Sequence, residues 1–477
     1  MRAQTQDGEQ HHLLRDFGLG ATISFAFAFI SPIVALYGVF AIGLTTTGGV
    51  FWWGAPITTA GQLLVALALG QLGSRWPIEG SIYQWSRNLL GRRYGWYAGW
   101  VYISALTVAM AAVAYGGGHF LAQLLGLSAG APTADVALAL VMLAAASAGN
   151  TIGRTVIKVT VGLCILAEII GSVGIGFYLL VFHHPNGLGV LLSQVPPTQS
   201  GFFNTPLALA VAYAGWSFLG FEAAGAIAEE VKEPARAVPK AMVASLVSVA
   251  SLVMLASLGL VLAIPDMPAV LAGKSADPVL DTLSSYLPPA AVELVLVTFV
   301  VAFFASLTSI QASASRIIWA FARERELPAA RFLNRLSGRG RVPANAILVT
   351  AALAATLCLL SATHLYQWLV SFTAAGFYLA FAFPVLGACI ARLRGRWQPG
   401  PVSLGAFGGV VTFAALAWIA FETVDIAWPR LPDANAAWYE AWIIPIVSVI
   451  ILVAGGLVRL FLGLDRQPAL AATPTES

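Results

Sequence analysis

Residues 214–222 read Ala-Gly-Trp-Ser-Phe-Leu-Gly-Phe-Glu and lie within a mostly apolar run from 205 to 228. The stretch holds two glycines, which weaken a helix, and one carboxylate, Glu222. A helix that faces lipid must satisfy its backbone polar groups internally, so glycine or proline inside a membrane span marks a kink or a break. The stretch therefore predicts a discontinuous helix in the interior of a membrane protein.

The composition of the whole chain supports a membrane protein. Of 477 residues, 58% are hydrophobic and only 10% are charged, against about 25% charged in a typical soluble domain. Such a chain cannot cover its surface with polar groups, so lipid must be its solvent. A spanning helix needs roughly 20 mostly apolar residues. Twelve runs meet this requirement: 17–43, 51–74, 94–124, 133–150, 157–182, 205–228, 240–263, 287–320, 344–361, 366–390, 402–424 and 441–464.

The distribution of Lys and Arg predicts the orientation. With the N-terminus in the cytoplasm, 23 of the 25 basic residues fall at cytoplasmic span ends or loops, and only Lys274 and Arg430 do not. Cytoplasmic loops carry an excess of basic residues, and a miscounted helix would invert every later loop. We therefore expect a multi-pass inner-membrane protein with cytoplasmic tails at 1–16 and 465–477. The acidic residues assigned to outer loops are Asp266, Asp277, Asp281, Glu422, Asp425, Asp433 and Glu440.

The first span contains a second interruption, at Ser31-Pro32. Proline lacks an N–H and disfavours helix at the residue before it. Spans one and six are five apart, and a repeat of five helices reverses its orientation in the membrane. We therefore infer two inverted halves, 17–182 and 205–390, and two further helices in 402–464. Interrupted helices at matching positions indicate a transporter's central site. An ordinary kink is the alternative, because other spans also contain prolines, at Pro56, Pro384 and Pro445.

Two acidic residues qualify as candidates at membrane depth, Glu168 in the fifth predicted span and Glu222 in the sixth. An acid at the centre of a membrane helix costs about 2.5–3.5 kcal/mol on insertion scales, so such residues are functional candidates. Each could couple proton movement to conformational change, and a structural hydrogen bond between packed helices is the alternative. Glu168 has apolar neighbours and no local partner in the sequence.

The eighth span is rich in small hydroxyl side chains. Ser306 and Ser309 offer oxygens that suit Na⁺, although the same groups equally suit hydrogen bonds between helices. The other polar residues of this span are Thr308, Gln311, Ser313 and Ser315. Aromatic residues that could close a site or contact an amine by cation–π attraction are Trp216 and Phe218, with Phe372 and Tyr378 as weaker candidates.

Several motifs resemble the amino acid–polyamine–organocation superfamily. They are Trp-Ser-Phe-Leu-Gly-Phe-Glu at 216–222 and Glu-Glu-Val-Lys-Glu-Pro-Ala-Arg-Ala-Val-Pro-Lys at 229–240. Ala-Phe-Ala-Arg-Glu-Arg-Glu-Leu-Pro at 320–328 and Gly-Ser-Ile-Tyr-Gln-Trp at 80–85 support them. The likeness covers residues 13–465 and is greatest for the amino acid/choline transporter branch, which includes GABA, choline and amino acid permeases.

The resemblance implies an all-α membrane protein of twelve transmembrane helices, with a LeuT-type five-plus-five inverted repeat and two C-terminal helices. It also implies alternating access, with Trp216 as gate, Glu222 as gating carboxylate and Glu168 at a coupling position. Free N–H groups at a half-helix N-terminus would bind a substrate carboxylate. The substrate contacts carried over are Ser31, Pro32, Ile33, Val34, Ala35, Gly215, Trp216, Ser217 and Phe218. Span one lacks the Gly-Ser-Gly-type break of many relatives, which favours a smaller pocket or another substrate.

We therefore predict a secondary active transporter for an amino acid or related small amine such as GABA. Coupling to H⁺ or Na⁺ is expected, with no cofactor, no bound metal and no nucleic-acid partner, and the oligomeric state is left open. A choline or polyamine carrier, or an amino acid exchanger of the same fold, is the alternative. The sequence contains no Walker-type phosphate loop, which argues against ATP as the driving force.

Membrane-embedded enzymes and channels are the alternatives from other classes. His183 and His184 are adjacent in an outer loop without a third ligand nearby, which favours solvated side chains over a metal site. No stretch resembles a pore filter or a charged gating helix. The three cysteines lie in apolar runs without metal-ligand spacing, which argues against a disulfide or zinc site: Cys164, Cys358 and Cys389.

Overall fold

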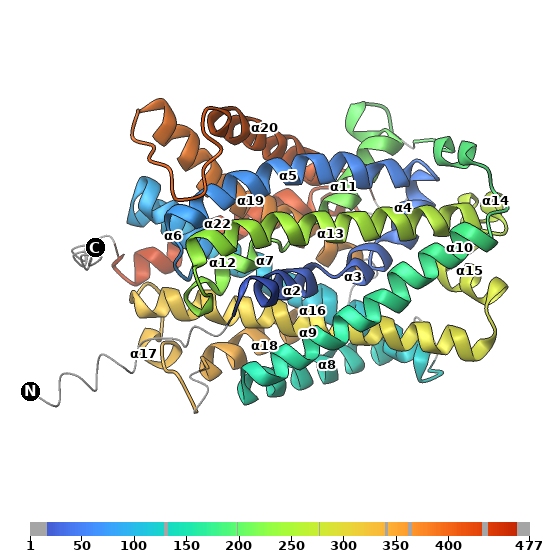
Figure 1. The fold of residues 1–477 in the computed structure, drawn as a ribbon, viewed down its shortest axis with the longest axis horizontal. Helices are drawn as coiled ribbons and strands as arrows, with labels where there is room; N and C mark the ends of the chain where they lie inside the picture. Colours follow the sequence, from blue (N-terminus) through green and yellow to red (C-terminus); the bar gives the residue numbers. More distant parts are fainter. Residues whose placement is uncertain are drawn as a thin grey trace, which may run out of the picture.

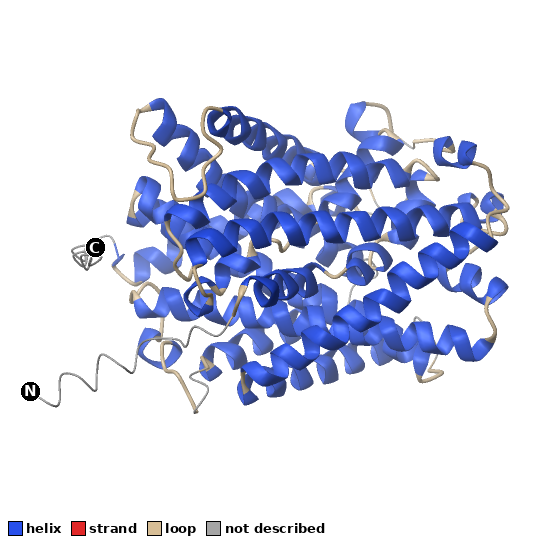
Figure 2. Ribbon diagram, in the orientation of Figure 1, coloured by secondary structure: helices blue, strands red, loops and turns tan. Residues whose placement is uncertain are grey.

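A computed structural model describes residues 17–127, 132–197, 199–275, 277–338, 342–360, 365–431 and 437–464. The predicted tails 1–16 and 465–477 lie outside these ranges, as does Asp433. The described chain is a bundle of long helices that run side by side along its longest axis (Figures 1 and 2). The predicted all-α architecture is confirmed for this part of the chain.

Ten helical segments in the described residues are long and apolar enough to cross a membrane. They are Leu19–Tyr37, Phe51–Arg75, Arg92–Leu124, Thr133–Ile152, Thr155–Phe182, Pro234–Ala263, Pro289–Arg323, Leu365–Leu393, Phe407–Ala427 and Ile443–Phe461. The two other predicted spans, 205–228 and 344–361, contain shorter helices. The protein is thus a multi-pass membrane protein, and the count of twelve spans stays a prediction.

The helices that build the bundle have the following bounds. They are α2 (Leu19–Ile30), α3 (Pro32–Tyr37), α4 (Phe40–Thr47), α5 (Phe51–Arg75), α7 (Arg92–Leu124), α8 (Pro132–Ile152), α9 (Arg154–Glu168), α10 (Ile175–Phe182), α11 (Pro206–Ser217), α12 (Ala223–Ala226), α13 (Pro234–Ala263), α16 (Pro289–Arg323), α18 (Ala344–Cys358), α19 (Leu365–Leu393), α20 (Phe407–Ala427), α21 (Trp438–Ala441) and α22 (Ile443–Phe461). A π-helical turn, Ile169–Gly174, joins α9 to α10.

Short helices mark the two ends of the bundle. At one end lie α6 (Ser81–Leu90), α12 and α17 (Ala330–Leu333), and at the other lie α14 (Met267–Leu271) and α15 (Pro278–Tyr286) (Figure 1). Ion pairs concentrate at the first end, which we call the basic end. They join Arg87 to Glu324, Arg92 to Glu326, Arg316 to Glu230 and Arg323 to Glu229.

The first span is interrupted at Ser31. This residue has φ 51° and ψ 114°, which separates α2 from α3. Its hydroxyl accepts a hydrogen bond from the Val34 N–H at 3.3 Å, and Pro32 occupies the first position of α3. A serine cap followed by proline starts a new helix, because proline needs no hydrogen-bond acceptor there. The predicted break in span one is present.

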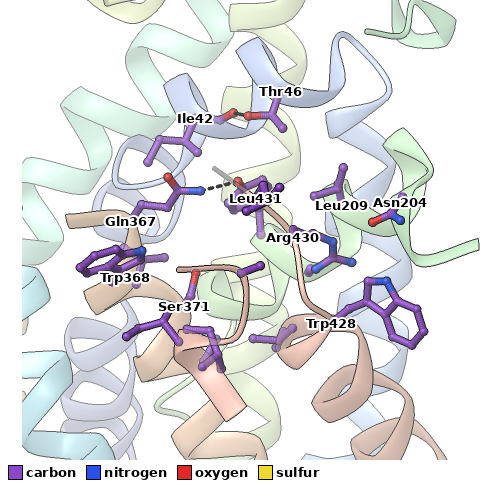
Figure 3. Close-up of a pocket in the computed structure, with 18 of the residues that line it drawn as sticks. Ile42, Thr46, Asn204, Leu209, Gln367, Trp368, Ser371, Trp428, Arg430 and Leu431 are labelled. Carbon is purple, nitrogen blue, oxygen red and sulfur yellow. Dashed lines mark hydrogen bonds between the residues drawn. The ribbon is translucent and has the colours of Figure 1, made fainter. Parts of the chain in front are cut away.

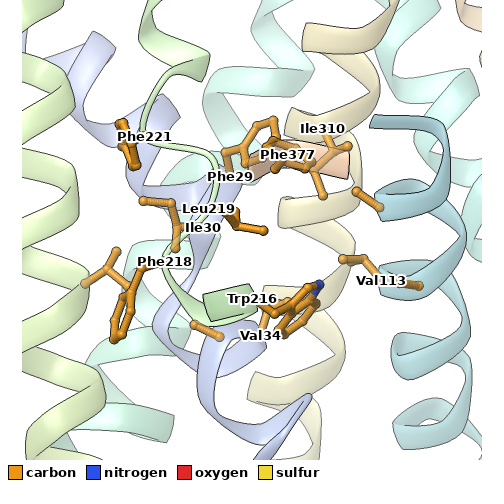
Figure 4. Close-up of a cluster of buried hydrophobic side chains, with 14 of the residues drawn as sticks. Phe29, Ile30, Val34, Val113, Trp216, Phe218, Leu219, Phe221, Ile310 and Phe377 are labelled. Atoms are coloured by element: carbon orange, nitrogen blue, oxygen red, sulfur yellow. The ribbon is translucent and has the colours of Figure 1, made fainter. Parts of the chain in front are cut away.

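The sixth span is interrupted between α11 and α12. Gly220 lies in this gap with φ 109°, a conformation that residues with a Cβ rarely adopt. A Cβ added there would lie 2.1 Å from Cδ1 of Phe29 in α2. Glycine is therefore required both by the backbone and by the close approach of span one (Figure 4). The predicted break in span six is also present.

The two interrupted spans run in opposite directions. At the basic end the Phe17 N–H donates to the Glu230 carbonyl at 3.0 Å, and the Lys232 N–H donates to the Phe17 carbonyl at 2.8 Å. The residue that precedes α2 is thus fixed against the segment that follows α12. Span one leaves the basic end as span six arrives there, so their half-helices meet in the middle of the bundle.

Candidate functional site

A cavity of about 680 Å³ opens between α4, α11, α19 and the segment after α20 (Figure 3). It lies away from the basic end, and we call it the vestibule. Its walls carry polar groups such as Thr46, Gln367 and Arg430. Gln367 donates to the hydroxyl of Tyr213 at 3.2 Å. Trp216 is part of the same lining and lies at the end of α11, next to the break.

A second cavity, of only about 30 Å³, lies between the two interrupted helices. We call it the central cavity, and its volume is far below the roughly 300–1,000 Å³ of a typical ligand pocket. The side chains around it are mostly apolar, with Ser306 and Thr373 as the polar ones. Its lining is Phe29, Ile30, Val34, Ala35, Ala109, Val113, Trp216, Leu219, Ser306, Ile310, Thr373 and Phe377. Figure 4 shows apolar members of this lining, among them Phe29, Trp216 and Phe377. The central cavity is therefore too small to hold an amino acid in this conformation.

Trp216 is the residue that the linings of both cavities share. Its side chain is 7% exposed, and its ring lies against Gly38 in the turn between α3 and α4. A Cβ added at Gly38 would lie 2.8 Å from two ring carbons of Trp216. A side chain at position 38 would thus clash with the indole that borders both the vestibule and the central cavity.

The predicted substrate contacts occupy different places. Val34, Ala35 and Trp216 line the central cavity. Ser217 ties the two breaks together, since its hydroxyl donates to the Ala35 carbonyl at 2.6 Å. Phe218 is fully buried, yet it is not part of the cavity lining and points to the other side of the break (Figure 4).

Glu168 binds the N-terminus of α3. Its carboxylate accepts hydrogen bonds from the Ser31 hydroxyl at 2.5 Å and from the Ile33 N–H at 3.1 Å. The other oxygen accepts from the Ser172 hydroxyl at 2.7 Å. The expectation that Glu168 has no local partner was wrong, because Ser172 lies one turn further along the chain. A carboxylate at a helix N-terminus is favoured by the free N–H groups and by the helix dipole.

The same contacts bear on the carboxylate site expected at a half-helix N-terminus, which stays a prediction. At the start of α3, Pro32 has no N–H, Ile33 donates to Glu168, and Val34 donates to Ser31. These first-turn N–H groups, expected to be free for a substrate carboxylate, are therefore occupied by the protein. The sequence did not reveal this, because it gives no distance between span five and span one.

The π-helical turn after Glu168 shapes this contact. Within it, the Gly171 carbonyl accepts a hydrogen bond from the Tyr37 hydroxyl at 2.9 Å. A Cβ added at Gly171 would lie 2.6 Å from Oγ1 of Thr298 and 2.8 Å from Cδ1 of Ile33. Span five thus approaches α3 closely through a glycine. Single π-helical turns within α-helices are frequent at functional sites.

Glu222 lies beyond the break in span six and is fully buried. One oxygen accepts from the Tyr102 hydroxyl at 2.9 Å, and the other accepts from the Gly220 N–H at 3.0 Å. It does not line the central cavity. Its contacts connect the break to Tyr102 in α7, and the predicted gating role of Glu222 stays a prediction.

Span eight supplies one contact to the site. Ser306 lines the central cavity and donates to the Phe29 carbonyl at the end of α2, at 2.7 Å. Ser309 donates within its own helix, to the Ala305 carbonyl at 2.9 Å. Gln311 donates to the hydroxyl of Ser147 in α8, which is a helix-packing contact. An ion site at Ser306 and Ser309 stays a prediction.

No group of three His, Cys, Asp or Glu side chains that could hold a metal ion is found among the described residues. His183 instead contacts the Tyr178 hydroxyl at 2.9 Å and stacks on the ring of Tyr286. All three cysteines are buried and form no disulfide: Cys164, Cys358 and Cys389.

The sequence missed several residues of the central cavity. Phe377 and Thr373 lie one turn apart on one face of α19, whereas the sequence pointed to their neighbours, Phe372 and Tyr378. Successive residues of an α-helix point about 100° apart, so an error of one residue selects another face. A polar residue one turn from an aromatic residue is the signal that could have identified this face.

Two acidic residues were placed wrongly. Glu422 and Asp425 were assigned to an outer loop, but both lie within α20 and are fully buried. Asp425 pairs with Arg430 at 2.5 Å. The helix continues past the apolar run because these side chains pack against other helices instead of reaching water.

The basic end is closed by a buried network. Arg316 donates to Glu230 at 2.5 Å, and Arg323 contacts Glu229 at 3.1 Å. Glu79, in the loop after α5, donates its backbone N–H to Glu229. Burial raises the pKa of the Glu79 carboxyl well above its usual range, and repulsion by Glu229 and Glu230 raises it further. The two arginines act on the same pKa in the opposite direction.

Comparison with known proteins identifies the family. The profile of the family described as amino acid permease matches residues 21–454. The chain belongs to the amino acid permease family. The amino-acid permease BAT1 of Arabidopsis thaliana is 23% identical to this permease, over 88% of this chain and 87% of its own length.

Two further relatives are named for different solutes, branched-chain amino acids and choline. The branched-chain amino acid permease BcaP of Lactococcus lactis is 27% identical, over 82% of this permease and 84% of its own length. A choline transporter of Saccharomyces cerevisiae is 27% identical, over 45% of this permease and 38% of its own length. The permease is therefore a membrane transport protein and not an enzyme, and its substrate is a small molecule.

Proposed function

We propose that this permease is a secondary active transporter for an amino acid or related small amine, working by alternating access with cation coupling. The observation that carries the proposal is the position of Trp216. One indole borders both the vestibule and the small cavity where two interrupted helices meet. The opposite end is closed by the network around Arg316 and Glu230. A site between two gates is what alternating access requires.

The orientation follows from the distribution of charge. The basic end is cytoplasmic, in agreement with the excess of Lys and Arg in cytoplasmic loops. The vestibule then faces the outside of an inner membrane, and both tails lie in the cytoplasm. The antiparallel course of the two interrupted spans supports an inverted repeat within a twelve-span fold.

The lining of the central cavity favours a solute with a small or branched apolar part. Phe29, Trp216 and Phe377 surround it with aromatic rings, and its polar groups are hydroxyls. Its volume of about 30 Å³ has to increase before any amino acid fits. Movement of Trp216 and of the half-helices would provide this space, which links binding to conformational change.

Glu168 is the proposed coupling group. It joins span five to the break of span one through Ser31 and Ile33. Protonation would remove the charge that the first turn of α3 stabilises. Proton binding and movement of α3 would then be linked, and H⁺ is the coupling ion that this contact favours over Na⁺.

A specific observation also favours a second candidate, a carrier for choline or a similar quaternary amine. The N–H groups of Ile33 and Val34 are occupied by the protein, which weakens one means of binding a carboxylate. The aromatic rings around the central cavity could instead attract a cation. A substrate without a carboxylate would fit this arrangement.

Counterflow in proteoliposomes tests the proposal. Labelled leucine, GABA and choline would each be offered to vesicles preloaded with the unlabelled solute. Transient, saturable accumulation of leucine or GABA supports an amino acid carrier, and accumulation of choline alone supports the second candidate. Trp216→Ala should weaken apparent affinity, whereas Trp438→Ala, at a side chain 73% exposed, should not. Unsaturable flux, or no flux of any amino acid or amine, would overturn the proposal.

The role of Glu168 needs a separate measurement. Glu168→Gln should abolish acceleration of uptake by an imposed pH gradient and leave counterflow of the same solute intact. Glu440→Gln provides a matched control, since Glu440 lies in the vestibule wall. A pH-gradient response that survives in Glu168→Gln would exclude Glu168 as the coupling group.

A further inference from the structure

A third carboxylate lies at membrane depth and has no role in the function proposed above. Glu422 is fully buried in α20, five residues before the end of the helix. Neither of its oxygens has a hydrogen-bond partner among the described residues. This distinguishes Glu422 from Glu168 and Glu222, whose carboxylates each accept hydrogen bonds from other helices.

Glu422 lies against the helix that carries the gate. A Cβ added at Gly215 would lie 3.1 Å from Oε2 of Glu422, and 3.4 Å from both Tyr378 and Ile426. These three side chains therefore converge on the backbone immediately before Trp216. Ile426, one turn beyond Glu422, is part of the vestibule lining. Glu422 is thus one helical turn from the vestibule and beside the gate.

The surroundings of Glu422 contain further unused polar groups. Tyr378 in α19 accepts a hydrogen bond from Nε2 of Gln62 in α5, at 2.9 Å. Oε1 of Gln62 is itself buried without a partner among the described residues. Three helices thus bring a carboxyl, a phenol and an amide into one buried region, which is unusual at membrane depth.

Glu422 forms no ion pair among the described residues, and the one cation whose charge acts on it, Arg430, is already paired. Arg430 is engaged by Asp425 at 2.5 Å and by the Phe203 carbonyl. Asp425, one turn away on the same helix, is itself acidic. The other titratable or charged residues on the helices packed against α20 are Tyr213 of α11, Tyr366, Tyr378, Cys389 and Arg392 of α19, Arg75 of α5, and Arg459 of α22.

The three arginines among these lie too far away to neutralise the carboxylate. Arg75, Arg392 and Arg459 lie in the last turns of their helices, at the basic end of the bundle. Gly408, at the start of α20, lies beside Arg392. Fourteen residues of helix separate Gly408 from Glu422, which corresponds to about 20 Å at 1.5 Å per residue. An unpaired ionised carboxylate buried in this way costs several kcal/mol.

We propose that Glu422 is a proton-binding site that exchanges protons with the vestibule and controls the contact between α20 and α11. With a proton on one carboxyl oxygen, the side chain is neutral and fits its buried position beside Gly215. After the proton passes to water, the carboxylate requires hydration. Water reaches it from the vestibule only when α20 and α11 separate, and α11 carries Trp216. Alkaline pH thus favours an open vestibule.

Accessibility of the vestibule tests this inference without knowledge of the substrate. Ser371→Cys places a reporter thiol in the vestibule wall (Figure 3), and the three native cysteines are buried. The labelling rate by a membrane-impermeant maleimide would be measured in the wild-type background and with Glu422→Gln, from about pH 5 to pH 8. At each pH the rate in the wild-type background is divided by the rate with Glu422→Gln. This ratio removes the effect of thiol ionisation, which is the same in both proteins.

The expected ratio is near one at the acidic limit and rises about threefold or more at the alkaline limit. Glu422→Met, which is also neutral, should match Glu422→Gln and guards against a folding defect in either variant. Glu440→Gln, in the vestibule wall, should retain the wild-type pH dependence.

Two outcomes would overturn the inference. One is a ratio that does not change with pH. The other is a ratio that changes at fixed pH when Na⁺ is replaced by N-methylglucamine, because the site would then bind Na⁺ and not a proton. Since labelling does not depend on transport, failure of this test leaves the proposed function standing, and absence of transport leaves this inference standing.

Discussion

The contact between Glu168 and the start of α3 gives the sharpest prediction. Glu168→Ala removes the acceptor of three buried donors, the Ser31 hydroxyl, the Ile33 N–H and the Ser172 hydroxyl. The two hydroxyls can rotate toward carbonyls of their own helices, but the Ile33 N–H has no such freedom. One buried amide without an acceptor costs about 1–3 kcal/mol.

Adding a smaller loss for the two hydroxyls, we expect Glu168→Ala to lower the free energy of unfolding by about 2–4 kcal/mol. Glu168→Gln keeps one carbonyl oxygen for the Ile33 N–H and should lose about 1 kcal/mol or less. The difference between the two variants is about 2 kcal/mol, which is more than tenfold in the unfolding equilibrium constant.

Unfolding by titration with SDS in mixed micelles measures this difference. Purified wild type and both variants would be compared at one pH, with tryptophan fluorescence as the signal. If Glu168→Ala is as stable as Glu168→Gln, the carboxylate does not cap α3 and the reasoning is refuted. If both variants match wild type, the contact contributes nothing to stability.

Three other substitutions test other parts of the structure. Gly220→Ala adds a Cβ to a residue with φ 109°, and this atom would lie 2.1 Å from a ring carbon of Phe29 in α2. We therefore expect the free energy of unfolding to fall by at least about 2 kcal/mol. Gly162→Ala, with no atom within 4 Å of the added Cβ, should leave it nearly unchanged. Arg316→Met breaks the buried ion pair with Glu230 and should lower the free energy of unfolding by about 3–5 kcal/mol in the same SDS titration. The pKa of the Glu79 carboxyl is raised in the folded state, from 4.5 for the unfolded chain. The protonated carboxyl therefore contributes its full stabilisation below pH 4.5, and this contribution is lost as pH rises through the folded-state pKa. Glu79→Gln should therefore flatten the decline of stability with rising pH.

Each of these expectations has an outcome that contradicts it. Equal stability of Gly220→Ala and Gly162→Ala would show that the gap in span six relaxes without strain. The double variant Arg316→Met with Glu230→Gln should recover part of the lost stability, and no recovery would exclude a coupled pair. Glu79→Gln that is less stable than wild type at neutral pH would show that the ionised carboxylate stabilises the basic end.

The sequence predicted the positions of the breaks well, because the causes are local. Pro32 removes a backbone donor wherever it occurs in a helix, and Gly220 permits a backbone conformation that other residues resist. The apolar runs were equally readable, since lipid imposes a minimum length on each span. These features depend on neighbours within a few residues.

The partners of the buried carboxylates were not predictable. Glu168 and Ser31 are 137 residues apart, and nothing in either stretch specifies the other. Glu422 was read as a loop residue because an acid near the end of an apolar run normally reaches water. Its burial against Gly215 depends on the packing of three helices.

The sequence by itself determined that this chain is a membrane protein, at which residues its helices are interrupted, and to which family it belongs. Composition and local backbone chemistry suffice for these. Only the tertiary structure decided which groups surround the central cavity and from which donors each carboxylate accepts hydrogen bonds. The physical reason is that a helix presents a new face every residue. The angle at which each face meets its neighbours is set by packing across the whole bundle.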